Sequence, residues 1–138
     1  MDVDQITLVQ KTWKKIAPLP TTATMFYGRL FALDPTIKQL FKGDMAVQRR
    51  KLMRMMNIAV NGLTDLEYLI PQIQTLGQRH HAYGVTPDHY NAVGAALLWT
   101  LEKNLGDEFT PDVSTAWSET YYLLAEIMKA TQRAVIGN

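Results

Sequence analysis

The chain has 138 residues, of which 47% are hydrophobic, and this is enough apolar material for one domain over residues 1–138 with a sizeable core. Its 14 basic and 13 acidic residues give a net charge of +1, which excludes the strongly basic footprint of a nucleic-acid-binding protein. Cysteine is absent, so disulfides and thiolate ligation of a metal are excluded as well.

Helical periodicity dominates the chain, and no stretch shows the sustained alternation of apolar and polar residues that is typical of a strand. The first helix is marked by apolar residues at helical spacing: Ile6, Val9, Trp13 and Ile16. Pro18 and Pro20 then separate this helix from a second one.

Three later segments repeat the helical spacing, each with one apolar face. The first of them carries Leu52, Met55, Met56, Ala59, Val60 and Leu63. The second carries Tyr90, Val93, Gly94, Leu97, Leu98 and Leu101. The third carries Val113, Ala116, Trp117, Tyr121, Leu124 and Met128. We therefore predict an all-α fold.

Capping residues, prolines and glycines predict where the helices begin and end. Three capping side chains stand directly before a proline, which at the first helical position loses only an N–H that would lack a partner anyway: Asp34, Thr86 and Thr110. Gly62 and Gly106 stand where helices should stop. Pro71 is expected to break the segment from Leu66 to His80 into a short helix and a following turn or two. About seven helices result.

The N-terminus carries Asp2 and Asp4 and lacks the basic start of a secretory signal. The longest purely apolar run, Val93 to Trp99, is far shorter than the roughly 20 residues that cross a bilayer. We expect a soluble, cytoplasmic protein that binds no membrane.

Aromatic and polar residues follow one another along these helices in a distinctive order: Phe26-Tyr27, Leu40-Phe41, Gln48, and His80 followed four residues later by Gly84. This order resembles the globin family, and within it bacterial single-domain globins and the haem domain of flavohaemoglobins. The similarity runs from about Trp13 to Gln132. It implies a globin fold, with about seven helices around a haem b (iron protoporphyrin IX).

His80 is the residue that the resemblance places at the proximal position, where a neutral imidazole binds the haem iron. His81 lies about 100° further round the helix, so both rings cannot face one iron. A lone histidine in a helical protein is more often at the surface or hydrogen-bonded in the core, and we interpret His81 and His89 in that way.

Tyr27 and Gln48 are the residues that the resemblance places beside the bound gas. A phenol at position 27 would donate a hydrogen bond to bound oxygen, which carries partial charge, whereas neutral carbon monoxide would gain much less. Gln48 lies four residues before Leu52 and hence on the same helical face, with an exposed helix position as its alternative. Adjacent aromatics such as Phe26 and Tyr27 are also common in ordinary cores.

Phe41 matches the globin phenylalanine that packs against the macrocycle, although an ordinary core aromatic would occupy nearly the same place. Six further residues are expected to line the pocket: Leu52, Met56, Leu76, Val85, Val93 and Leu97. Lys51 is expected to meet a haem propionate, with Arg49 and Arg50 competing for that role. Otherwise this basic group, which includes Arg54, is a solvated helix face or has one member facing a bound carboxylate.

Tyr90 lies ten residues after His80, as in flavohaemoglobin-type domains. There a tyrosine and a glutamate hydrogen-bond around the histidine and raise its basicity. Gln132 stands at the position corresponding to that glutamate, and a neutral amide cannot supply the same negative field. This departure from the family pattern disfavours peroxidase-like behaviour and strong electron donation to iron, although Tyr90 remains.

The leading hypothesis is reversible oxygen binding, for storage or transport, by a monomer or weak dimer whose partners are oxygen, nitric oxide and carbon monoxide. The enzymatic alternative is nitric oxide dioxygenation, which would need a separate reductase because 138 residues leave no room for a flavin and nicotinamide domain. A haem-based sensor is disfavoured because we expect no signalling domain beside the haem domain. A helical protein without a cofactor is the remaining alternative.

Overall fold

The computed structural model describes residues 1–137, and their side chains as far as Ala134. The described chain consists of six α-helices and three 3₁₀ helices, with no strand among them: α1 (Val3–Ile16), α2 (Thr22–Leu33), η1 (Pro35–Leu40), α3 (Met45–Asn61), η2 (Gly62–Thr64), α4 (Leu66–Ala82), α5 (His89–Leu105), η3 (Gly106–Glu108) and α6 (Pro111–Gly137). The six α-helices and the six-residue η1 make up the seven predicted helices, and η2 and η3 are single turns. The predicted all-α class is confirmed.

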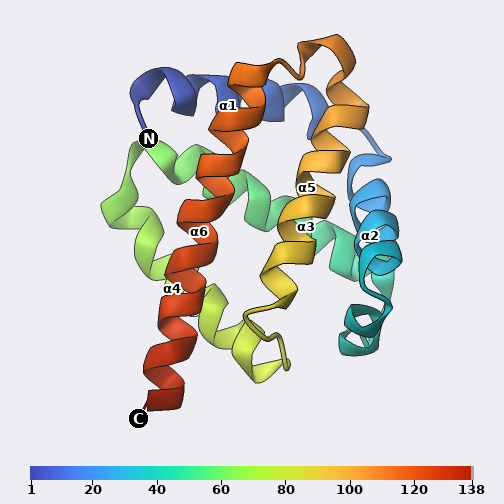
Figure 1. Ribbon diagram of the computed structural model, residues 1–138, viewed down its shortest axis with the longest axis vertical. Helices are drawn as coiled ribbons and strands as arrows, with labels where there is room; N and C mark the ends of the chain where they lie inside the picture. The colour runs from blue at the N-terminus through green and yellow to red at the C-terminus, as the bar shows by residue number, and fades with distance from the viewer. Residues whose placement is uncertain (138) are drawn as a thin grey trace.

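The long helices pack in two crossing layers. α5 and α6 run antiparallel in front of α3, which passes behind both of them (Figure 1). α4 packs against α6, α2 against α5, and α1 against α6. Within residues 1–137, no helix combines the length and the apolar character needed to span a membrane.

Most of the helix boundaries follow the predicted capping chemistry. Asp34 caps η1 and Thr110 caps α6, each by accepting a hydrogen bond from a backbone N–H two or three residues further on. Gly62 and Gly106 are the C-caps of α3 and α5, as predicted. Gly106 has a φ of 57°, a conformation that glycine adopts without the steric cost of a Cβ.

The prediction that Pro71 breaks its segment is wrong, because α4 continues from Leu66 to Ala82 with the proline inside it. Proline at this position removes the N–H that would donate to the carbonyl of Glu67. Leu69 and Ile73, on either side of the proline, are both buried to 99%. Their burial in the core offsets the loss of one backbone hydrogen bond.

The predicted start of α5 is also wrong, because the helix begins at His89 and not at Pro87. The backbone N–H of Thr86 donates to Nδ1 of His89 at 3.0 Å, so residues 86–88 form a turn before the helix. The N-cap residue of α5 is Asp88, which makes no side-chain capping bond, so the predicted threonine cap is absent. His89 holds the preceding turn and has the structural role expected of it.

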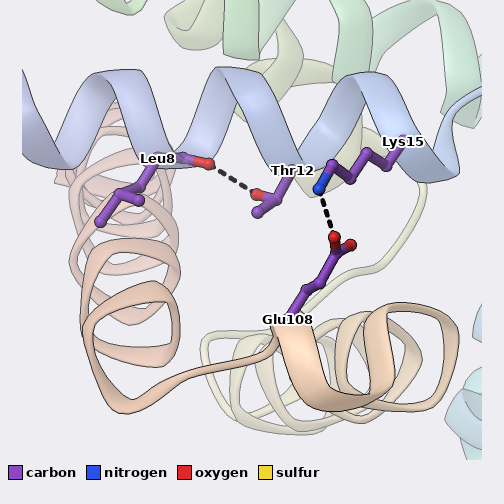
Figure 2. Close-up of polar contacts among 4 residues, drawn as sticks. All are labelled: Leu8, Thr12, Lys15 and Glu108. Atoms are coloured by element: carbon purple, nitrogen blue, oxygen red, sulfur yellow. Dashed lines mark hydrogen bonds and ion pairs between the residues drawn. The ribbon is translucent and has the colours of Figure 1, made fainter.

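Tryptophan side chains tie α1 to the helices that flank it. Trp13 Nε1 donates to Asn57 Oδ1 on α3 at 2.7 Å, and Trp117 Nε1 on α6 donates to Thr12 Oγ1 at 2.9 Å. The Thr12 hydroxyl can accept this bond because its own hydrogen is donated to the carbonyl of Leu8 (Figure 2). These two hydrogen bonds fix the position of α1 relative to α3 and α6.

Ion pairs contribute little to the fold. Lys15 and Glu108 pair at the surface between α1 and η3 (Figure 2), and Lys129 pairs with Glu126 within α6. These are the only two ion pairs among the side chains that the structure describes. Exposed pairs of this kind are worth about 0–1 kcal/mol each. The stability of the fold therefore rests on its apolar interior.

The apolar interior consists of two clusters. We call the larger one the main cluster; it joins α1, the end of α3, α4, α5 and α6 around buried residues such as Val9, Trp13, Leu69, Leu101 and Trp117. We call the smaller one the α2 cluster; its buried members are Phe26, Tyr27, Leu30, Ile37 and Ala96. Leu97 on α5 packs against both clusters and is only half-buried.

Gly77 allows α4 and α6 to approach each other closely. A Cβ at this position would lie 2.9 Å from the backbone Cα and O of Met128, atoms that cannot move without shifting α6. Gly77→Ala is therefore expected to destabilise the protein by about 1–3 kcal/mol through overpacking. Chemical denaturation followed by circular dichroism measures this loss. Gly43→Ala is the control, since nothing lies within 4 Å of its added Cβ; equal midpoints for the two variants would contradict the close packing.

Candidate functional site

Tyr27 and Gln48 are brought together from two different helices. Tyr27 is on α2, and Gln48 is in the first turn of α3, where the Asp44 carboxylate caps the helix by accepting from the N–H of Ala46. Gln48 Nε2 donates to the hydroxyl oxygen of Tyr27 at 3.3 Å. Because the hydroxyl accepts this bond, its own hydrogen is free to be donated to a third group.

An aromatic cage holds the ring of Tyr27 in place. Phe41, just after η1, meets Tyr27 edge to face with ring centroids 5.4 Å apart, and Phe31 lies 5.8 Å from Tyr27 and 5.5 Å from Phe41. Phe26 also meets Tyr27 edge to face, with ring centroids 5.1 Å apart. Burial raises the pKa of the Tyr27 hydroxyl, an effect that the hydrogen bond from Gln48 opposes only in part. The phenol therefore stays protonated, and a hydrogen-bond donor, at neutral pH.

His80 lies in the last turn of α4 with one ring nitrogen already engaged. Its Nδ1 is 3.0 Å from the carbonyl oxygen of Leu76. Because a carbonyl can only accept, Nδ1 must carry the hydrogen, and in the neutral ring the lone pair is then on Nε2. Burial lowers the pKa of His80, and the bond to Leu76 opposes this only in part, so the neutral ring is favoured at pH 7. A neutral imidazole with a free Nε2 is the form that binds a metal.

The predicted pocket wall consists of side chains that are neither in the core nor at the surface. Six apolar residues from α3, α4, α5 and the segment after α4 are all half-buried: Leu52, Met56, Leu76, Val85, Val93 and Leu97. Some pack against the α2 cluster and others against the main cluster. Covering the exposed part of these side chains would stabilise the protein by roughly 25 cal/mol per Å² of apolar surface. A large flat apolar cofactor such as haem fits these residues, because it would cover their remaining exposed surface.

Lys51 is exposed on α3, and neither of the two ion pairs of the described side chains includes it. Its ammonium is thus available to an anionic group, as a partner of a propionate must be. Arg49 is half-buried and Arg50 exposed beside it.

Tyr90 and Gln132 stand where the related domains have a tyrosine and a glutamate, but the two side chains do not hydrogen-bond to each other. Gln132 is 1% exposed, and its Nε2 donates to the carbonyl of Val85 at 3.1 Å. The buried hydroxyl of Tyr90 has no partner among the described residues, and burial raises the pKa of Tyr90 to about 12. Gln132 therefore anchors the segment that follows His80. A buried hydroxyl without a protein partner is rare, and a bound water, a ligand or a functional role accounts for such a group.

Two residues near the site were missed by the sequence reasoning. Phe31 completes the aromatic cage, and its position four residues after Tyr27 on one helix face was the available signal. The Tyr121 hydroxyl donates a hydrogen bond to the carbonyl of Tyr90 at 2.6 Å. This contact between α6 and α5 could not be predicted from any local sequence pattern.

Comparisons with known proteins show which family the chain belongs to. The Globin family model matches residues 24–128 of the chain. A flavohemoprotein of Bacillus subtilis (strain 168) is 31% identical over 109 residues, which are 77% of this chain and 27% of that protein. A flavohemoprotein of Xylella fastidiosa (strain 9a5c) is 31% identical over 134 residues, which are 94% of this chain and 34% of that protein. The chain thus spans about a third of the length of these relatives.

A solved structure shows the same fold. The bacterial globin from Campylobacter jejuni superposes with a TM-score of 0.82 over 99% of this chain and 100% of that one, at 21% sequence identity. The resemblance inferred from Tyr27, Gln48 and His80, and the fold it implied, are both confirmed. The chain is a member of the globin family, whose proteins bind diatomic gases at a haem.

Proposed function

We propose that this globin binds oxygen reversibly at a haem b, whose iron His80 would hold, with Tyr27 and Gln48 as hydrogen-bond donors to the gas. The observation that carries the proposal is the hydrogen bond from Gln48 to Tyr27, which places two polar groups together in an otherwise apolar cluster. Haem iron, when bound, supplies one open coordination position for a diatomic gas.

Each of the other residues has a definable task in this proposal. The carbonyl of Leu76 holds the ring of His80 in the tautomer that leaves Nε2 free. Phe41 would pack against the macrocycle, and Lys51 would pair with a propionate. The apolar wall keeps water away, so that the hydrogen bonds from Tyr27 and Gln48 are not shared with solvent.

Visible spectra of the purified ferrous protein test the proposal directly. We expect the spectrum of a five-coordinate haem without oxygen, a different spectrum with oxygen, and full return to the first when oxygen is removed. A protein that contains no haem, or whose iron oxidises at once on exposure to oxygen, would contradict reversible oxygen binding.

We infer a second function, nitric oxide dioxygenation, from the similarity to flavohemoproteins over 94% of the chain. The name of those relatives indicates both a flavin and a haem, and a flavin would supply electrons to iron. In this proposal a separate reductase supplies the electrons to this globin. The neutral Gln132, bonded to the carbonyl of Val85, gives the proximal side no carboxylate to strengthen electron donation from His80.

The oxygen-loaded 138-residue chain is expected to convert one nitric oxide per haem to nitrate and then to stop in the ferric state. One turnover needs only bound oxygen and an accessible pocket, whereas repeated turnover needs an electron donor. Stopped-flow mixing with nitric oxide, followed by nitrate assays with and without an added reductase, measures both. Repeated turnover on a nicotinamide donor alone would refute the need for a reductase, and no nitrate at all would refute the dioxygenase proposal.

A further inference from the structure

A groove of about 610 Å³ lies outside the proposed gas site, between the link from α1 to α2 and one face of α3. The link contributes residues 17–20, which include two prolines, and α3 contributes Arg49, Arg50, Met53 and Arg54. Arg50 is two residues after Gln48, which places it about 200° further round the helix. The groove and the Tyr27–Gln48 pair therefore lie on opposite faces of α3.

The groove is rich in unpaired positive charge. Three of its lining residues are arginines and none is acidic. Neither ion pair among the side chains of residues 1–134 includes Arg49, Arg50 or Arg54. Like charges four residues apart on a helix, such as Arg50 and Arg54, repel one another. An anion bound between them would relieve this repulsion, and a guanidinium fits the two oxygens of a carboxylate or phosphate.

The opposite wall of the groove is apolar and rigid. Pro18 and Pro20 have restricted backbones, and Leu19 between them is 40% exposed although it is a large hydrophobic residue. Asn57 also lines the groove; its Oδ1 accepts from Trp13, which leaves its Nδ2 hydrogens free to be donated to a ligand. The groove thus combines cationic donors on one side with apolar surface on the other.

We propose that this groove binds a small amphipathic anion, with a carboxylate or phosphate head on the arginines and a short apolar body against residues 17–20. Its volume is that of a small-molecule site. The proposal is separate from the haem function, because it places Arg49 and Arg50 in the groove and leaves the haem propionate to Lys51, and because it uses none of the residues proposed to contact the gas.

Isothermal titration calorimetry of the purified protein under carbon monoxide, with octanoate and octyl phosphate, tests the proposal. We expect one-to-one binding of at least one of them, and the tighter of the two identifies the head group. Acetate, inorganic phosphate and 1-octanol, each of which carries only half of the ligand chemistry, should bind at least about tenfold more weakly. Binding by acetate or octanol as tight as that of the complete amphiphile would overturn the amphipathic site.

Variants locate the binding. Arg50→Gln and Arg54→Gln are each expected to weaken binding about tenfold, as the loss of a charge-assisted hydrogen bond would. Lys103→Gln removes the same charge from an exposed position on α5 and should leave the affinity unchanged. If all three variants lose affinity equally, or none does, the arginines are not the binding groups.

Nuclear magnetic resonance gives a second readout in the same sample. The indole N–H of Trp13 is bonded to Asn57 in the groove, so its resonance should shift when the ligand binds. The indole N–H of Trp117 is bonded to Thr12 away from the groove and should not shift. A ligand that leaves the Trp13 resonance unchanged but alters the visible spectrum would occupy the gas site and would overturn the proposal, as would the absence of binding by either amphiphile.

Discussion

His80→Ala is expected to abolish stable haem retention, or to make it depend on added imidazole, whereas His81→Ala should retain haem normally. The reason is geometric: the two rings point about 100° apart on α4, and it is His80 that bonds to Leu76 through Nδ1 and keeps Nε2 free. The ratio of Soret to protein absorbance after gel filtration measures the haem that each variant retains.

Circular dichroism of both variants provides the control for folding, since loss of haem from an unfolded chain would say nothing about ligation. A His81→Ala protein that loses haem while His80→Ala keeps it would show that the proximal residue is wrong by one position. The assignments that depend on the orientation of α4, including Leu76, would then change with it.

Tyr27→Phe and Gln48→Leu should each speed oxygen dissociation by about one to two decades while changing carbon monoxide dissociation little. A hydrogen bond to a group with partial charge is worth roughly 1.5–3 kcal/mol, which corresponds to that range of rates if it is lost from the bound state. Stopped-flow displacement of each gas gives the two dissociation rates.

The contact between Gln48 and Tyr27 sharpens this expectation. Gln48 donates to the hydroxyl that is proposed to donate to the gas, so removing the amide also frees the phenol to turn. The double variant should therefore lose less than the sum of the single losses. Equal effects of each variant on oxygen and carbon monoxide would mean a steric role and would contradict the donor assignment.

The fold was predictable where its causes are local. Apolar spacing located the long helices, and Asp34, Thr110, Gly62 and Gly106 marked their ends because capping depends on a few neighbouring residues. The predicted break at Pro71 failed because burial on both sides of the proline, which the local sequence does not encode, keeps α4 continuous.

The site was predictable from family resemblance and only in part from residue chemistry. The resemblance selected Tyr27 and Gln48, but the direct hydrogen bond between them depends on how α2 meets α3. The resemblance placed Gln132 near the expected proximal histidine, but it did not predict the bond from its amide to the carbonyl of Val85, a partner 47 residues away. The residue pattern of a single sequence does not predict contacts between helices that are distant along the chain.

Leu97 packs against both apolar clusters, so the two halves of the interior meet where the haem is proposed to bind. A cofactor that touches both clusters binds the folded chain and not the unfolded one, and by thermodynamic linkage each tenfold rise in its free concentration above its dissociation constant adds about 1.4 kcal/mol to the free energy of unfolding. The supply of haem in the cell would then set how much of this globin stays folded, and with it how much escapes proteolysis.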